Sequence, residues 1–404
     1  MVRITINSAV LDNALSDLNR VVDKKAHMPV LLNIRMSIDS TGRISLTARN
    51  GFEMNMTKTL QADTFSGSGA FLADAEILAN TLRGLSEQDI TLTYDESRAS
   101  VAVSYIGGST SFAADEISKW PADAIHDEVK ATIRMQGKTL TAGIARCQYA
   151  IGHDDTRPSL CGVFMRREGE RPTFAATDGR RLTITDRQLE QGGQDFAAIL
   201  PERLCNILRA SVKQGNQVAV SFGGAYAHFD YGNTHLDAAL IEQRYPNVRA
   251  VVPVAPPYHI EIDRKTLAAS VKRVSLFADK DSQLVVFKLQ GNELIVTGRD
   301  DTLFSRAITE RMDVAKAYAS EGGEIPCELQ FGLSAKYMLT TLDAFGADMV
   351  DMGIIDAYHA VSLLGDSATT ILMPMQIPEE QPESEEGEPV KEEVEEEVEE
   401  AVEA

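Results

Sequence analysis

Carboxylates beside basic residues are the groups in this 404-residue chain that could do acid–base chemistry. Asp154-Asp155 and Asp178 lie near arginines, and seven histidines are available. However, the sequence holds no phosphate-binding loop, no dinucleotide fingerprint and no nucleophile elbow. An Asp before Gly, as in Asp178-Gly179, is far more often a turn former than a catalytic acid. We therefore expect no catalytic site, with an enzyme as the alternative that these carboxylates leave open.

The cysteines predict neither a metal site nor a disulfide framework, because the sequence has no C-x-x-C and no His at ligand spacing. We expect packed, reduced thiols, a cytoplasmic location and no cofactor. No apolar run approaches the roughly 20 residues needed to cross a bilayer, and the chain opens directly in a strand pattern, so we expect neither a membrane span nor export. The four cysteines are Cys147, Cys161, Cys205 and Cys327.

The elements that carry these residues recur three times, at intervals of about 127 residues. In each copy a period-2 apolar pair runs into an apolar stripe of helical spacing, which predicts a strand followed by an amphipathic helix. Turn signals at Asn50-Gly51 and Asp178-Gly179 keep step with these openings. The three openings are Ile4, Ile6, Leu11, Leu15 and Leu18; Ile133, Met135, Leu140, Ile144 and Cys147; and Ile260, Ile262, Leu267, Val271 and Val274.

A second helix signal recurs later in each copy. Ile77, Leu78, Leu82 and Leu85 match Tyr337, Met338, Leu342 and Phe345 in spacing, whereas the stretch around Leu204, Ile207 and Leu208 fits less well. The repeat predicts an α+β fold of three domains, each with two helices on antiparallel sheets and each large enough to bury a core. The expected boundaries are 1–124, 125–253 and 254–377.

Residues 378–404 form an acidic tail with fourteen Glu and one Lys. Its formal charge of −13 leaves −8 of the net −21 on the rest of the chain. Such a composition predicts disorder, and a solvated solubility segment is the simplest interpretation. The alternative is a helix formed on a partner, with the tail regulating access to a nearby site. That alternative is based on the apolar residues Val390, Val394, Val398 and Val402.

Cations lie opposite the apolar stripes at matching places in all three copies. A solvated helical face explains any single Lys or Arg, but recurrence favours contacts to nucleic-acid phosphates. The candidates on the first helices and just after them are Arg20, Lys24, Lys25, Arg146, Lys272, Arg273 and Lys280, and those on and after the second helices are Arg83, Arg203, Arg209 and Lys213.

Three motifs in order on this repeat resemble the bacterial DNA polymerase III beta subunit, the sliding clamp family. The resemblance covers residues 1 to about 377. Its motifs are Ala176-Thr177-Asp178-Gly179-Arg180-Arg181-Leu182; Arg244-Tyr245-Pro246-Asn247-Val248-Arg249-Ala250-Val251-Val252-Pro253; and Leu372-Met373-Pro374-Met375.

The resemblance implies a head-to-tail homodimer closed into a six-domain ring, with helices lining the hole and sheets outside. A member of this family is a non-enzymatic processivity factor that encircles duplex DNA without reading its sequence. It tethers the DNA polymerase III alpha subunit, the clamp loader and other clients. The alternative is a clamp-like acidic decoy or regulatory protein that does not encircle DNA.

The resemblance also implies a groove for short client peptides and further DNA contacts. His153 and Arg157, with Lys25, would contact single-stranded template. The implied groove residues are Leu160, Thr177, Gly179, Arg180, Arg181, Leu182, Pro246, Val251, Ile371, Leu372, Met373, Pro374 and Met375.

Overall fold

The structure is a computed structural model. It describes residues 1–378 apart from residue 26 and residues 122–127, 169–170, 187–193, 301–305, 321, 323–324, 326–328 and 366–367. Beyond Pro378, the acidic tail lies outside the described residues. No helix among the described residues is long and apolar enough to span a membrane.

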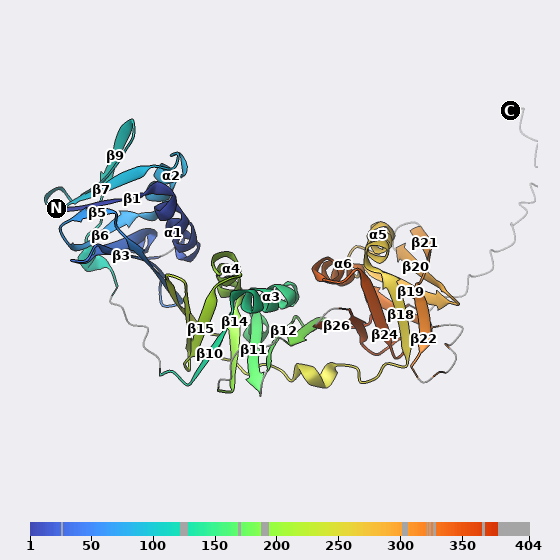
Figure 1. Cartoon of the computed structure of the whole chain (residues 1–404). Helices are drawn as coiled ribbons and strands as arrows, with labels where there is room; N and C mark the ends of the chain where they lie inside the picture. The colour runs from blue at the N-terminus through green and yellow to red at the C-terminus, as the bar shows by residue number, and fades with distance from the viewer. Residues whose placement is uncertain are drawn as a thin grey trace, which may run out of the picture.

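Three units follow one another along the chain with the same order of elements, a strand and helix, a set of strands, a second helix and three more strands (Figure 1). The first unit consists of β1 (Val2–Asn7), α1 (Ser8–Val21), β2 (Asn33–Ile38), β3 (Arg43–Asn50), β4 (Met54–Gln61), β5 (Thr64–Ser66), β6 (Gly69–Asp74), α2 (Ala75–Arg83), β7 (Asp89–Asp95), β8 (Ser100–Tyr105) and β9 (Gly108–Ala113).

The second and third units repeat this order, so the two helices expected in each copy are confirmed. The second consists of β10 (Ala131–Gln136), α3 (Gly137–Cys147), β11 (Gly162–Glu168), β12 (Arg171–Thr177), β13 (Arg181–Asp186), β14 (Phe196–Pro201), α4 (Glu202–Ser211), β15 (Gln217–Phe222), β16 (Tyr226–Tyr231) and β17 (Thr234–Ala239). The third consists of β18 (Tyr258–Asp263), α5 (Arg264–Val274), β19 (Leu284–Gln290), β20 (Glu293–Asp300), β21 (Arg306–Asp313), β22 (Lys316–Ala319), β23 (Leu329–Ser334), α6 (Ala335–Ala344), β24 (Met349–Ile354), β25 (Val361–Leu364) and β26 (Ala368–Leu372).

Short 3-10 helices lie in the loops between these elements. They are η1 (Pro29–Leu32), η2 (Glu96–Arg98), η3 (Ile117–Lys119), η4 (Gln148–Ala150), η5 (Pro158–Leu160), η6 (Val248–Val251) and η7 (Ser275–Phe277).

Local sequence explains why each first strand turns directly into a helix. Asn7 and Asp263 end their strands and cap the next helix, because their side-chain oxygens accept hydrogen bonds from backbone N–H groups of the first turn. In the second unit Gly137 begins the helix, and a Cβ there would lie 2.3 Å from the carbonyl oxygen of Lys213. Close backbone approach therefore requires glycine at that position.

The sheets run across the unit boundaries and join the units edge to edge. One sheet has the order β10-β15-β16-β17-β4-β3-β2-β6, so β17 pairs with β4. Another has the order β14-β11-β12-β13-β26-β25-β24-β18-β22, so β13 pairs with β26. The remaining sheets, β5-β1-β7-β8-β9 and β21-β20-β19-β23, lie at the two ends of the chain of units and leave β9 and β21 as edges among the described strands.

The helices lie on the concave side of an arc, and the strands form its outer wall (Figure 1). α1 contacts α2 and α4, α4 contacts α3, and α5 contacts α6. Their apolar stripes are buried against the sheets; Leu11, Leu15 and Leu18 of α1, for example, are fully buried. The first two units share one apolar core and the third has its own. The polar faces of the helices are consequently turned toward the open side of the arc.

Candidate functional site

Exposed cations stand on the helices or just beyond their ends, facing away from the buried stripes. Of the predicted DNA contacts, those with exposed side chains on or beside these helices are Arg20, Lys24, Lys25, Arg83, Arg209, Lys213, Lys272, Arg273 and Lys280. Because the helices line the concave side of the arc (Figure 1), the structure brings these charges to one surface.

Two of these cations are held by carboxylates. Lys24 Nζ lies 3.4 Å from Glu76 Oε1, and Arg273 donates through Nε and Nη2 to the two oxygens of Glu310 at 2.6 and 2.7 Å. These hydrogen bonds raise the pKa of Arg273 and lower the pKa of Glu310. Arg273 would have to leave Glu310 to contact a phosphate.

The predicted template contacts, His153 and Arg157, are both exposed in the loop between α3 and β11. His153 Nδ1 lies 3.5 Å from Glu202 Oε2, and Arg157 Nε donates to Asp154 Oδ2 at 3.0 Å. The pKa of Asp154 is lowered, first by the Thr156 hydroxyl that donates to it and then by the Thr156 backbone and Arg157. Both basic side chains are therefore near the surface but have acidic neighbours.

Arg146 does not lie on the exposed helical face, and this expectation is corrected, whereas Arg203 is half-buried. Arg146 is 6% exposed, donates to the carbonyl oxygen of Ala344 and stacks over the Phe345 ring at 4.8 Å. Arg203 Nη2 donates to the carbonyl oxygen of Val21 at 2.8 Å, at the C-terminal end of α1. Helical periodicity placed both opposite the apolar stripe, but the third unit covers Arg146, and the first unit accepts hydrogen bonds from Arg203. Both therefore connect units, and Arg146 is closed off from the concave surface.

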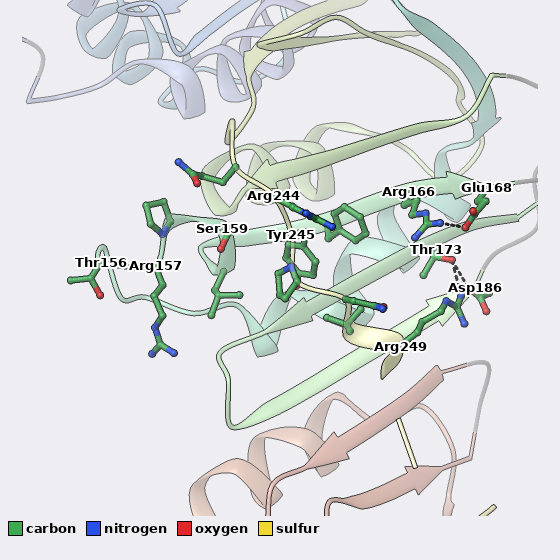
Figure 2. A pocket seen from close by; sticks show the side chains of 17 residues that line it. Thr156, Arg157, Ser159, Arg166, Glu168, Thr173, Asp186, Arg244, Tyr245 and Arg249 are labelled. Carbon is green, nitrogen blue, oxygen red and sulfur yellow. Dashed lines mark hydrogen bonds and ion pairs between the residues drawn. The ribbon is translucent and has the colours of Figure 1, made fainter. Parts of the chain in front are cut away.

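The outer side of the second unit carries a groove beneath the connector that leads to the third unit (Figure 2). The connector crosses an apolar cluster of Ala175, Leu182, Ile184, Ile199, Tyr245, Val248 and Ile371. Beside it opens a cavity of about 1090 Å³, whose lining includes the predicted residues Leu160 and Pro246 as well as Arg157. The structure thus gathers part of the predicted peptide site around a hollow.

Several groove residues were absent from the sequence prediction. The Phe164 and Tyr245 rings stack with centroids 4.4 Å apart, and burial raises the pKa of Tyr245. Arg249 Nη2 donates to Asp186 Oδ1 at 2.9 Å and to Thr173 Oγ1 at 3.1 Å, closing one end of the hollow (Figure 2). Strand alternation carried the signal for Phe164, because its neighbours on β11 point into the core.

The junction of β13 and β26 separates the predicted residues onto two faces. Leu182 pairs with Ile371, and both belong to the outer cluster beneath the connector. Arg181 pairs with Leu372. Leu372 belongs to the third unit's core, which corrects its assignment to the groove. Arg181 also faces the helices, where its guanidinium lies over the Tyr149 and Tyr337 rings at 5.2 and 5.0 Å.

A tight turn forms the rim between these strands. Thr177 Oγ1 accepts from the Gly179 N–H at 3.1 Å and donates to the Arg181 carbonyl oxygen at 2.6 Å. Gly179 has φ +87°, which favours glycine, and a Cβ there would lie 3.2 Å from Arg157 Nη1. The backbone carbonyl oxygen of the exposed Arg180 accepts a hydrogen bond from the Met373 N–H at 2.9 Å. This bond holds the residue that follows β26 against the turn.

The remaining predicted residues lie where the chain leaves the groove. Met373 and Val251 are 46% and 54% exposed, whereas Pro374 and Met375 are half-buried. The Met375 N–H donates to the Gly332 carbonyl oxygen at 2.8 Å. Neither Met373 nor Val251 lines the cavity itself, but each closely follows a residue of the apolar cluster along the chain, Ile371 and Val248 respectively.

Comparison with known proteins gives the same threefold division. Models of the N-terminal, central and C-terminal domains of the DNA polymerase III beta subunit match residues 2–114, 134–247 and 249–376. The chain belongs to this family.

Relatives and solved structures agree along most of the length. The chain is similar to the beta sliding clamps of Synechocystis sp., with 26% identity over 91% of this chain and 97% of the relative, and of Escherichia coli K12, with 23% identity over 93% and 100%. Among solved structures, the Streptococcus pyogenes beta subunit matches with a TM-score of 0.84 and 18% identity. A Pseudomonas aeruginosa sliding clamp bound to griselimycin matches with a TM-score of 0.85 and 18% identity. Each covers 93% of this chain and 100% of the solved chain.

Proposed function

We propose that the chain is a DNA polymerase processivity factor that acts as a ring around duplex DNA. The observation that carries this proposal is the concave layer of helices with exposed cations, ended on both sides by sheet edges. Once DNA is enclosed, dissociation requires the ring to open, whereas movement along the axis exchanges only weak, sequence-independent phosphate contacts. Retention is then a matter of topology, so a modest number of cations suffices.

The two internal junctions predict how a second copy closes the ring. In each junction the last strand of one unit pairs with the third strand of the meander that follows the first helix of the preceding unit: β17 pairs with β4 of β2-β3-β4, and β26 pairs with β13 of β11-β12-β13. β9 is the last strand of the first unit, and β21 is the strand equivalent to β4 and β13 in the third unit. Pairing β9 of one protomer with β21 of another satisfies both edges and gives a closed head-to-tail dimer.

The register of this pairing follows from the first junction. β9 and β17 are each the second strand of a hairpin whose first strand ends in a tyrosine. Tyr105 pairs with Gly108, the first residue of β9, and Tyr231 pairs with Thr234, the first residue of β17. Thr234 pairs with Lys58, the fifth residue of β4, and the fifth residue of β21 is Glu310. Gly108 should therefore lie opposite Glu310 of the partner protomer. The adjacent pair is Ser109 with Thr309, and both are exposed in the single chain.

The outer groove is the proposed docking site for client peptides. The apolar cluster under the connector and the exposed Val251 and Met373 offer an adaptable floor and rim for a short linear motif. We propose the DNA polymerase III alpha subunit, the clamp loader and other clamp-motif proteins as clients. A polymerase held there remains beside the primer end after it dissociates, which raises its effective concentration.

The proposed role is non-catalytic and belongs to the cytoplasm, where a bacterial chromosome is replicated. Holding DNA by enclosure needs no nucleophile and no general base. The predicted carboxylate candidates have structural partners instead: Asp178 accepts from the backbone N–H groups of Arg180 and Arg181 at 2.9 and 3.0 Å. That arrangement supports the turn interpretation of Asp178-Gly179.

Retention on DNA of two topologies tests the proposed function. The chain is loaded onto nicked circular plasmid with a clamp loader and separated by gel filtration in 0.5 M NaCl. We expect it to stay with circular DNA and to be lost after one restriction cut. Equal recovery before and after the cut, or no retention on the circle, would instead favour a decoy that does not encircle DNA.

A further inference from the structure

The outer face of the sheet shared by the first two units carries a compact cluster of imidazole and carboxylate groups. His228, His235 and Asp237 each offer one ligand atom, and these atoms lie within 4.8 Å of one another. His228 lies on β16, whereas His235 and Asp237 lie on β17, the strand that joins the second unit to the first. Their neighbours Phe229, Leu236 and Ala238 are buried in the core, so strand alternation turns the cluster outward.

Cross-strand pairing sets the geometry of the cluster. His228 is directly opposite Asp237, and its Nδ1 lies 2.7 Å from Asp237 Oδ1. His235 is two residues before Asp237 on the same strand, and its Nε2 lies 2.8 Å from the same oxygen. Both ring nitrogens thus lie within hydrogen-bond distance of the same carboxylate oxygen, Asp237 Oδ1.

Two further side chains hold the converging groups in the orientation that metal ligands need. The second nitrogen of His235, Nδ1, lies 2.6 Å from Asp230 Oδ1, an arrangement that leaves Nε2 as the ligand atom. Asn55 Nδ2, on β4 of the first unit, donates to Asp237 Oδ2 at 3.1 Å and leaves Oδ1 directed at the histidines. A carboxylate that orients a histidine and a donor that orients a carboxylate are the usual outer partners of metal ligands.

We propose that His228 Nδ1, His235 Nε2 and Asp237 Oδ1 bind one divalent transition-metal ion at the junction of the first two units. A tetrahedral ion with bonds of about 2.0 Å separates its ligand atoms by about 3.3 Å, so Asp237 Oδ1 needs to move away from each ring nitrogen by roughly half an ångström. Asp237 and His228 side chains are 9% and 14% exposed, and that of His235 is 45% exposed. The ion would enter from the His235 side and keep a water there as its fourth ligand.

The donor set selects the class of ion. Two imidazoles and one carboxylate suit Zn²⁺, Cu²⁺ or Ni²⁺, whereas Mg²⁺ and Ca²⁺ take oxygen ligands in larger numbers. The ion would cross-link β16 to β17 and, through Asn55, reinforce the contact of β17 with β4. Its expected role is to stabilise the strand that joins two units of the ring.

Zinc binding to the full chain tests the proposal. Equilibrium dialysis of untagged protein against Zn²⁺, with 1 mM Mg²⁺ present, should give one tight site per chain. Co²⁺ in place of Zn²⁺ should give the visible absorption bands of a tetrahedral N- and O-ligated ion. The double variant His228→Asn with His235→Asn keeps all four thiols and should lose that site and those bands. A far-ultraviolet circular dichroism spectrum identical to the parent's would show that the variant is folded.

Two single variants complete the design. Asp230→Asn keeps every ligand and should weaken Zn²⁺ binding about 10- to 100-fold, because only the outer partner of His235 is lost. His359→Asn removes an exposed histidine that also contacts an aspartate, Asp356, and should leave the affinity unchanged. A parent chain that binds no Zn²⁺ at micromolar concentration, or one whose tight site survives in the double histidine variant, would overturn the proposal. Unchanged affinity in Asp230→Asn would also contradict it.

Discussion

Single side chains divide into those that connect the units and those left free for a ligand. Arg146 shows why sequence alone could not separate them. Its position opposite the apolar stripe of α3 is the same as that of the exposed cations, but the Ala344 carbonyl and the Phe345 ring cover it. Helical spacing predicts the direction in which a side chain points, and only the neighbouring unit decides what it meets there.

Replacing Arg146 with Ala should destabilise the chain by about 2 to 3 kcal/mol, because a buried guanidinium gives up a hydrogen bond and a packed ring contact. Urea unfolding followed by circular dichroism measures this loss. Arg209→Ala removes an exposed cation from the neighbouring helix α4 and should change stability by less than about 0.5 kcal/mol. Equal effects of the two substitutions would show that Arg146 is not a connecting residue.

Val251→Ala should weaken the binding of a client peptide about 10-fold, because two exposed methyl groups would be lost from the rim of the groove. The probe is a synthetic peptide that carries the clamp-binding segment of a polymerase III alpha subunit, measured by fluorescence anisotropy. Val254→Ala is the matched control, since Val254 is 89% exposed and lies beyond η6, whereas Val251 is in η6 with the lining residues Val248 and Arg249. A peptide that binds both variants equally well would place the client site elsewhere.

The sequence predicted the helices and strands more completely than it predicted the sites that they position. Apolar spacing predicted α1, α3 and α5 and the strands before them, because each helix must bury one stripe on a sheet. It could not tell which of Ile371 and Leu372 faces the groove side of β26, since both are apolar and the strand has a core on each side. It also could not reveal the His228, His235 and Asp237 cluster, because cross-strand register brings those residues together and no fixed spacing signals it.

The helical layer makes a prediction about salt. Replacing Lys25, Arg209 and Lys272 together with Gln should reduce the slope of log K against log salt for duplex DNA by about 3, since each neutralised phosphate contributes roughly 0.9. Binding to a short linear duplex across a series of NaCl concentrations measures the slope. A second triple variant, with Arg43, Arg98 and Lys130 changed to Gln, removes the same charge from strands and loops and should retain the parent slope. Equal slopes in the two variants would contradict a DNA surface on the helices.

For the whole molecule, action as a clamp requires that the three similar units be doubled into a closed ring. The repeat and the resemblance predicted that architecture, while the pairing of β17 with β4 and of β26 with β13 supplied the rule by which a second copy attaches. A dimer formed this way has twice the 44.1 kDa mass of the chain, and sedimentation at micromolar concentration should find that mass.

The most direct test of the ring is a disulfide placed across the predicted β9–β21 pairing. A chain with Ser109→Cys and Thr309→Cys should form a covalent dimer under mild oxidation, seen on a non-reducing gel, because the proposed register sets these residues opposite each other and within disulfide reach. Ser104→Cys with Thr309→Cys, which moves one thiol a strand further from the edge, should not. Covalent dimer at the same low level in both variants and in the parent would contradict the head-to-tail ring.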